Sequence, residues 1–375
     1  MPELGWRPMG TSAYLTSSVM VMLESLPLTC DDTVCDELQP ASLSCLAGVS
    51  KMMNSVVWGY QRRSFNITRT LSLFMTVEEA FCFRVLQAKT GMIIIGSVVV
   101  QFMDRAPLKD IDLDVAVGHE HSYEVGRWLC LIGYQFQSDL GPAHSFAEAH
   151  VQATLGMHRD LGAFGSPLFW SRVASVFTFR HILRSTTIHL ISAEYSPLDV
   201  ILASHSTCVM NFITHEQAVS LYPFEMFHSR WSLVCNTVDS MQETSRQKYV
   251  RRGWTMVKSL TYMEIINPKS EFRTRNRFVG DDNTWALSLE PAIPYPSSSL
   301  SANSWHHGYG LLRGGTLTSE QFSAPGPSNR YLLANDSEYL DFIQPMCVVG
   351  LTSGGDVIET EDIVALLNAF NSTVM

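Results

Sequence analysis

Residues 92–117 read MIIIGSVVVQFMDRAPLKDIDLDVAV, and this stretch decides the fold. Met92 to Ile95 form a short apolar run that predicts a buried strand, and Gly96-Ser97 gives the chain a sharp exit from it. We expect a short helix over 98–104 and a second strand over 111–117. Strand-like and helix-like runs alternate as far as Pro223, which is typical of a layered domain with a mixed sheet.

Two aspartates lie on the second predicted strand. Asp112 and Asp114 alternate with Leu113 and Val115, so the two-residue period of a strand places both carboxylates on one face. Two carboxylates on one face repel each other, and a divalent metal ion with phosphate oxygens is a common way to neutralise them. The alternative is an ordinary strand with two solvated aspartates near an edge of the sheet.

The order of strand, Gly-Ser, helix and Asp-x-Asp strand resembles the nucleotidyltransferase superfamily typified by DNA polymerase beta. The resemblance implies that Gly96 and Ser97 bind the triphosphate of a nucleotide. It also implies that Asp112 and Asp114 are catalytic residues that hold Mg²⁺. A third carboxylate on a later strand completes the pattern of this superfamily.

The third carboxylate is the weak point of the resemblance. The next suitable strand, over 186–191, reads TTIHLI and offers His189 where an acidic residue is expected. Neutral imidazole is a poor ligand for Mg²⁺, since hard cations prefer oxygen. Glu194 and Asp199 are the nearest acids, and both follow the strand. We therefore expect a nucleotidyltransferase fold whose catalysis is absent or much weakened, with an active Mg²⁺-dependent nucleotidyltransferase as the alternative.

A helical pattern precedes this domain, from Leu26 to Lys51. Its register resembles the F-box, a short three-helix module that docks onto a Skp-family adaptor of a ubiquitin ligase. The resemblance implies a partner-binding surface made of seven residues: Leu26, Pro27, Leu38, Pro40, Leu43, Leu46 and Val49. We expect Leu43, Leu46 and Val49 to share one face of a helix. Thr29, Asp31 and Ser42 depart from the family pattern, and the alternative is that these helices pack on the following domain.

Together these features give an α+β fold class and five segments. They are a tail over 1–24, an F-box-like helical module over 25–75, a nucleotidyltransferase-like domain over 77–290, an irregular Pro-, Gly- and Ser-rich excursion over 291–330, and a C-terminal segment over 331–375 that packs on the domain. Further segments, including 188–214, resemble a group of largely uncharacterised fungal proteins that combine the two modules. In that group His205-Ser206-Thr207 and Asn211 are expected to brace a helix.

Composition limits the functional classes. The chain has 26 Lys or Arg against 36 Asp or Glu, so its net charge of −10 argues against a surface that clamps nucleic acid or an anionic membrane. Its eight cysteines include no Cys-x-x-Cys pair, and we expect reduced, buried thiols. The apolar stretch before Leu23 lacks the features of a signal peptide, which favours a cytoplasmic or nuclear protein without a membrane span.

Two weaker signals remain. Nine Lys or Arg between Arg246 and Arg277, interleaved with aromatic residues, form a basic island that could hold a nucleotide or RNA, or simply be a solvated face. His306-His307 is more typical of a loop than of a metal site. The sequence thus predicts an F-box-type adaptor for an unknown client protein, carrying a catalytically degenerate nucleotidyltransferase-like domain.

Overall fold

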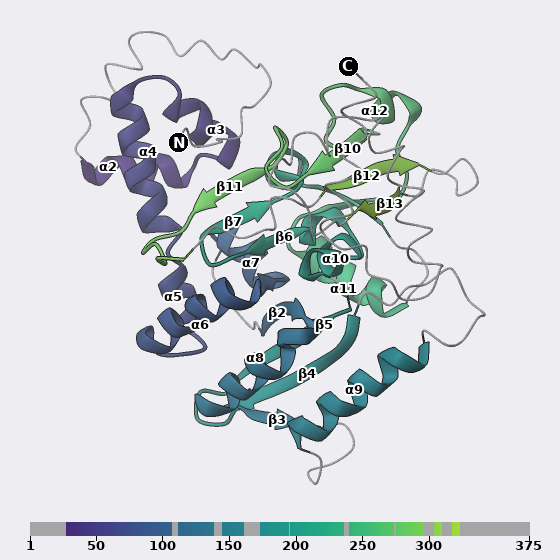
Figure 1. The fold of residues 1–375 in the computed structure, drawn as a ribbon. Helices are drawn as coiled ribbons and strands as arrows, with labels where there is room; N and C mark the ends of the chain where they lie inside the picture. The colour runs from purple at the N-terminus through teal and green to yellow at the C-terminus, as the bar shows by residue number, and fades with distance from the viewer. Residues whose placement is uncertain are drawn as a thin grey trace, which may run out of the picture. The chain divides into compact units, whose positions relative to one another are not determined.

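A computed structural model describes residues 28–106, 112–138, 145–160, 173–194, 196–235, 240–273, 275–295, 304–309 and 317–322 (Figure 1). The chain divides into two compact units. Unit 1 runs to Ser259 and includes Asp282–Ser298, and unit 2 comprises Leu260–Asp281 and the chain from Ser299 onward. The predicted tail over 1–24, Leu26, Pro27 and the segment over 331–375 lie outside the described residues.

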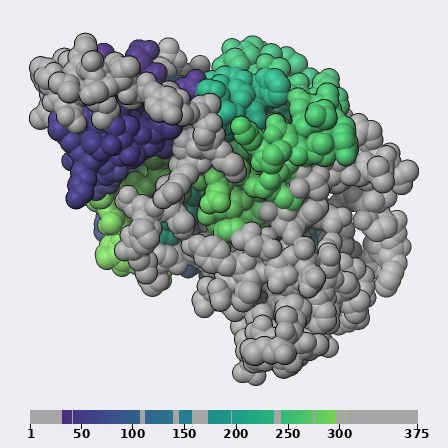
Figure 2. All heavy atoms as spheres, turned by 90° about the horizontal axis from the view of Figure 1, so that it is seen from above, coloured from purple at the N-terminus to yellow at the C-terminus, as the bar shows by residue number. Residues whose placement is uncertain are grey.

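Unit 1 begins with three helices: α2 (Leu28–Asp36), α3 (Pro40–Ala47) and α4 (Lys51–Ser64). Pro40 occupies the first position of α3, where a missing N–H costs nothing. Ser50 caps α4, since its hydroxyl accepts a hydrogen bond from the Met53 amide at 3.1 Å. Figure 2 shows the atoms of this module as a compact purple group.

The three helices bury a small core of their own. Met53, Val57 and Tyr60 recur at helical spacing on one face of α4. They pack with Cys35, Leu43 and Leu46, all of them buried. The helices therefore cover much of their apolar surface against one another. This is contrary to our expectation that three helices this short can bury their apolar faces only against a partner protein.

Two helices link the module to the sheet. They are α5 (Ile67–Leu71) and α6 (Val77–Thr90), and α6 corresponds to the helical pattern that the sequence predicts from Val77. Thr76 and Glu79 form a reciprocal capping box at the start of α6. Gly91 ends the helix in the left-handed conformation, with φ of 66°.

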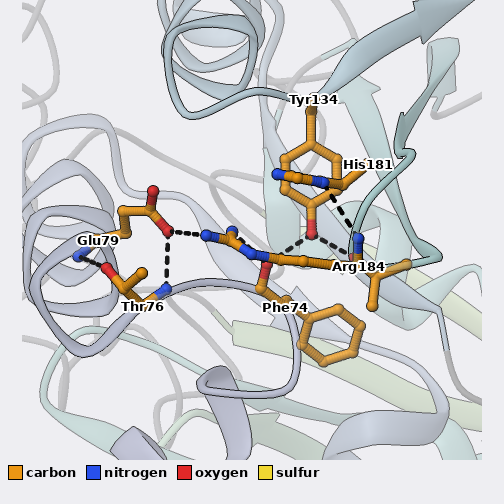
Figure 3. A network of polar contacts seen from close by, with 7 residues as sticks. Phe74, Thr76, Glu79, Tyr134, His181 and Arg184 are labelled. Atoms are coloured by element: carbon orange, nitrogen blue, oxygen red, sulfur yellow. Dashed lines mark hydrogen bonds and ion pairs between the residues drawn. The ribbon is translucent and has the colours of Figure 1, made fainter.

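A polar network ties the start of α6 to the far end of the sheet (Figure 3). The carbonyl oxygen of Phe74 accepts hydrogen bonds from the Tyr134 hydroxyl at 2.8 Å and from Arg184 Nη1 at 3.0 Å. Arg184 Nη2 also lies 3.0 Å from Glu79 Oε2. Residues far apart in sequence therefore meet at one backbone carbonyl, which fixes the loop before α6 against the β4–β5 turn.

The main sheet has eight strands in the order β11-β7-β6-β1-β2-β5-β4-β3. Their bounds are β1 (Ile93–Ile95), β2 (Leu113–Gly118), β3 (Gln135–Gln137), β4 (Val173–His181), β5 (Thr186–Ala193), β6 (Asn211–Ile213), β7 (Gln217–Ser220) and β11 (Trp285–Ser288). Strands β2 and β5 are parallel, whereas β1 pairs antiparallel with both β2 and β6. The expected mixed sheet and α+β class are confirmed.

Helices pack on this sheet within unit 1. They are α7 (Ser97–Met103), α8 (His119–Leu131), α9 (Phe146–Asp160), α10 (Pro197–Leu202) and α11 (Ser240–Arg251), with the short turns η1 (Thr207–Val209) and η2 (Phe224–Ser229). A parallel pair of short strands, β8 (Trp231–Leu233) and β9 (Thr255–Val257), completes the unit. Every side chain of α7 is buried, so the helix after Gly96 is a core element.

The structure of unit 2 differs from two of the predicted segments, the domain over 77–290 and the irregular excursion over 291–330. Strands β10 (Arg275–Phe278), β12 (Ser304–Tyr309) and β13 (Leu317–Phe322) form an antiparallel sheet, beside the short helix α12 (Tyr262–Ile266). The excursion over 291–330 is therefore not irregular throughout, because two of its segments are strands. The predicted domain over 77–290 is also not continuous, since Leu260–Asp281 belongs to unit 2.

The thiol prediction is correct only in part. Cys35 and Cys208 are free and buried, but Cys45, Cys82 and Cys130 are free and exposed. Each of these three lies on a helix, and a helix of a layered domain turns only part of its surface toward the core. Within the part of the chain that the structure describes, no helix is both long and apolar enough to cross a membrane.

Candidate functional site

The close approach of Gly96 to Asp114 is the geometric centre of the candidate site. The antiparallel register of β1 and β2 sets Ile95 opposite Asp114. Gly96 follows with φ of 75° and ψ of −148°, a conformation open essentially to glycine alone. A Cβ atom at residue 96 would lie 2.5 Å from Asp114 Oδ2. The two strands predicted around Gly96 are neighbours in the sheet.

The other predicted site residues lie around this contact. Ser97 is the first residue of α7 and is buried. Asp112 is exposed and lies two positions before Asp114, just outside β2, which begins at Leu113 rather than at residue 111. Asp114 is half-buried, on the face of β2 opposite to the fully buried Leu113.

His189 occupies the position directly beside Asp114. The parallel register of β2 and β5 pairs the two residues, and His189 Nδ1 donates to Asp114 Oδ1 at 2.9 Å. This hydrogen bond raises the pKa of His189 above its ordinary value, and the charges of Asp114 and Asp112 act in the same direction against the effect of burial. The strand predicted over 186–191 thus supplies a hydrogen-bond donor to the carboxylate.

Lys248 on α11 lies within reach of the charges of the two aspartates. Burial and the neighbouring Arg252 lower the pKa of Lys248, while the charges of Asp114 and Asp112 oppose that shift. Sequence reasoning placed Lys248 only within a general basic island and did not associate it with the aspartates. No local sequence pattern could have linked Lys248 to Asp114, because more than a hundred positions separate them.

The donor set does not fit Mg²⁺. A hard cation takes six or more oxygen ligands, several of them carboxylates or phosphates. Asp112 is exposed, and Asp114 Oδ1 already accepts a hydrogen bond from His189. Across the described ranges, no group of three or more His, Cys, Asp or Glu side chains is arranged to hold a metal ion. Glu194 follows β5 directly and Asp199 is buried in α10.

The predicted partner-binding residues of the helical module separate into two groups. Pro40, Leu43 and Leu46 are buried, and Leu38 is partly buried against the same core. Val49 is 40% exposed and lies beyond the end of α3, so the expectation that it shares a helix face with Leu43 and Leu46 is wrong. The chain turns at Gly48 before Ser50 caps the next helix, which removes Val49 from the helical period.

Exposed apolar side chains on α4 were missed by sequence reasoning. Met52 is 46% exposed and Trp58 is 45% exposed. We call Val49, Met52 and Trp58 the exposed apolar set of the module. The wide spacing of the buried residues of α4 could have revealed these positions, because they fall outside the Met53–Val57–Tyr60 face.

The module also contacts the rest of unit 1. Arg105, at the end of α7, donates to the Tyr60 hydroxyl and to the carbonyl oxygens of Cys35 (2.8 Å) and Leu38. His228 Nδ1 lies 2.8 Å from Gln39 Oε1. These contacts agree with the alternative that the helices pack on the following domain.

The segment 205–211 braces neighbouring elements. The Thr207 hydroxyl accepts from the Leu233 amide at 3.0 Å, and Asn211 Nδ2 donates to the Cys208 carbonyl oxygen at 2.8 Å. Ser206 Oγ lies 2.7 Å from His205 Nδ1, and burial lowers the pKa of His205 to about 4, with the nearby charge of Arg246 contributing. The segment therefore holds β8 against η1, as expected of a bracing role.

His306 and His307 lie on strand β12, opposite Asn276 and Arg275 in the register of β10, rather than in a loop.

The chain matches no protein-family model, and comparisons with curated proteins and with solved structures also return no match.

Proposed function

We propose that this chain is an interaction protein of the adaptor type, built on a nucleotidyltransferase-like scaffold whose catalytic chemistry is lost. The observation that carries the proposal is the pairing of His189 Nδ1 with Asp114 Oδ1 at 2.9 Å. In the related enzymes a third carboxylate would stand at this position of the sheet. Here the chain supplies its own positive charge to the aspartate.

The electrostatics of the pair support a binding role over metal-dependent transfer. A protonated imidazole neutralises Asp114 without any metal, and its N–H occupies an oxygen that Mg²⁺ would need as a ligand. A cation entering this site would have to displace His189 and would also meet the positive charge of Lys248, which lies within reach of the same aspartates. Both effects disfavour Mg²⁺ at Asp112 and Asp114.

The helical module supplies the adaptor half of the proposal. Its core is filled by its own side chains, yet Val49, Met52 and Trp58 remain exposed near the start and the middle of α4. Exposed aromatic and methionine side chains are enriched in protein interfaces. We propose that this exposed apolar set binds a Skp-family adaptor, while the rest of unit 1 recognises an unknown client.

The adaptor half is tested by pull-down of the full-length chain with a purified Skp-family adaptor. Met52→Asp should remove binding, because an unpaired carboxylate would be buried in the interface. Asn54→Asp is the matched control, since Asn54 is an exposed polar residue of the same helix and gains the same charge. Equal capture of the Met52 variant, with unchanged thermal unfolding, would contradict the proposal.

A second function is favoured by one specific observation. Gly96 brings the backbone against Asp114, which is the arrangement that an active Mg²⁺-dependent nucleotidyltransferase would require. Turnover of labelled ATP or UTP with Mg²⁺, abolished by Asp112→Ala and by Asp114→Ala, would establish this alternative. The acceptor would then have to be found, and Glu194 or Asp199 would be the first residues to substitute in search of a third acid.

A further inference from the structure

Two histidines link helix α8 to helix α9 and to the sheet through the hydroxyl groups of Ser122, Thr154 and Ser192. His119 Nδ1 lies 2.7 Å from Ser192 Oγ on β5, and its Nε2 lies 2.9 Å from Thr154 Oγ1 on α9. His150 Nε2 on α9 lies 2.9 Å from Ser122 Oγ on α8. The two imidazole rings stack with their centroids 4.8 Å apart and their planes within 5°.

The hydroxyl groups determine which ring nitrogens carry protons, because each hydroxyl has one proton to donate. Ser122 donates its proton to the His119 carbonyl oxygen at 2.7 Å, so it must accept from His150 Nε2. Thr154 donates to the His150 carbonyl oxygen at 3.0 Å, so it must accept from His119 Nε2. Both Nε2 atoms are therefore protonated, and Nδ1 of a neutral His119 accepts from Ser192.

A second proton on either ring opposes this arrangement. On His119 it would sit on Nδ1, facing the proton of Ser192, whose side chain is fully buried. On His150 it would place a positive charge over the stacked ring of His119. Burial and the neighbouring His119 both lower the pKa of His150, in agreement with this geometry.

Little around His150 could compensate its positive charge. From α8 the facing groups are His119 and Tyr123, whose ring lies 5.3 Å from that of His150. From β4 the neighbour is Phe177, with ring centroids 6.0 Å apart, and from α9 itself it is Phe146 at 6.1 Å. Among the described residues no carboxylate forms an ion pair with His150. A hydrogen bond with the His119 backbone favours the charged form, but burial and the charge of His119 outweigh it and lower the pKa of His150.

Helix α9 is attached partly through this network and partly through apolar contacts. Phe146, at the start of α9, packs against Phe177 and Phe179 of β4, with ring centroids 5.2 Å from each. Beyond this anchor His150 and Thr154 make polar contacts with α8, and the partly buried Ala149 and Ala153 pack against the main core. The outward side chains Val151 and Leu155 are exposed.

We propose that α9 is a pH-sensitive helix: it docks on α8 while His119 and His150 are neutral, and acidification releases it beyond its Phe146 anchor. Protonation of His150 breaks the stacked pair, and the freed segment uncovers the face of Phe177 on which His150 is stacked. Docking is complete above the ordinary pKa of histidine, about 6.5, and is lost as the pH falls below it, because the released helix binds the proton more readily. This inference does not rest on the proposed adaptor function.

Hydrogen exchange of the full-length protein tests the release. We expect exchange of amides 150–156, normalised for its intrinsic pH dependence, to rise several-fold, up to about tenfold, between about pH 7.5 and about pH 5.5. His150→Phe keeps an aromatic ring in the stack and should abolish the rise. His121→Gln is the matched control, since His121 is an exposed histidine of α8 paired with Glu124, and this variant should keep the rise.

Three results would overturn the proposal. The first is unchanged protection of α9 at the lower pH. The second is simultaneous loss of protection in β2 and β5, which would indicate global unfolding. The third is an NMR titration of the native protein in which His150 gains its proton at or above about pH 6.5, the ordinary value. The titration decides the matter even if His150→Phe fails to fold.

Discussion

His189 and Asp114 stand side by side on the parallel strands β2 and β5, joined by a hydrogen bond of 2.9 Å between Nδ1 and Oδ1. The bond joins an acid to a base at the position where the resemblance to nucleotidyltransferases places a third acid. Exchanging the base for an acid is therefore the most informative change in the candidate site.

His189→Asp should create a site for Mg²⁺ with a nucleotide. The new carboxylate would add an oxygen ligand and release Asp114, so Mg²⁺-dependent binding of ATP measured by calorimetry should strengthen by about 1 to 3 kcal/mol. His189→Asn is the matched control, because it removes the cation without adding a charge. Equal binding by both variants would show that the missing acid does not limit the site.

Gly96→Ala should destabilise the protein by about 2 to 4 kcal/mol, as judged by chemical denaturation. The new Cβ would collide with the Asp114 carboxylate, in addition to the backbone strain. Gly91→Ala separates the two effects, since Gly91 has φ of 66° but no atom within 4 Å of its Cβ position. That control should lose only about 1 kcal/mol. Similar losses in both variants would mean that the contact with Asp114 is unimportant.

Arg105→Met should loosen the helical module. The change keeps the aliphatic stem but removes the hydrogen bonds to Tyr60 and to the carbonyls of Cys35 and Leu38. We expect faster hydrogen exchange in α2 and α4 and a loss of about 1.5 to 3 kcal/mol in their local stability. Arg63→Met removes the exposed ion pair with Asp32 and should change little. An equal effect of the two substitutions would argue against a link through Arg105.

His205 should make stability depend on pH. Burial holds its folded-state pKa at about 4, while the unfolded chain binds the proton near 6.5. The free energy of unfolding should therefore fall by on the order of 2 kcal/mol as the pH drops from about 6.5 to about 4, and this group should add no slope above 6.5. His205→Asn keeps an acceptor for Ser206 and should flatten that slope. A slope identical to that of the native protein would refute the assignment.

The sequence predicts the local elements of this fold but not the contacts between segments that are distant in the chain. The strand-turn-helix order around Gly96, the strand of His189 and the helix after Thr76 all follow from short-range patterns of burial and capping. The sequence did not predict strands β12 and β13. They pair with each other, but the surrounding segment is rich in Pro, Gly and Ser, a composition that indicates irregular structure. The hydrogen bond from Arg105 to Tyr60 likewise depends on how distant segments pack together, and no local hydrophobic periodicity predicts that packing.

The same reasoning explains the mixed result for the helical module. Leu43 and Leu46 were correctly identified as the apolar face of a helix, but a pattern cannot tell a face that binds a partner from a face that fills its own core. Only the exposed set of Val49, Met52 and Trp58 distinguishes the two, because exposure depends on where the other helices lie.

The path of the chain through the two units has a consequence for how this protein is synthesised. Strand β11 closes one end of the main sheet against β7 and contributes the buried Trp285 and Leu287, yet it follows Leu260–Asp281 of unit 2 in the chain. While the ribosome is still translating that stretch, β7 presents an unpaired edge, which is the kind of surface that promotes aggregation. The edge of β7 can be paired only after residue 288 has left the exit tunnel.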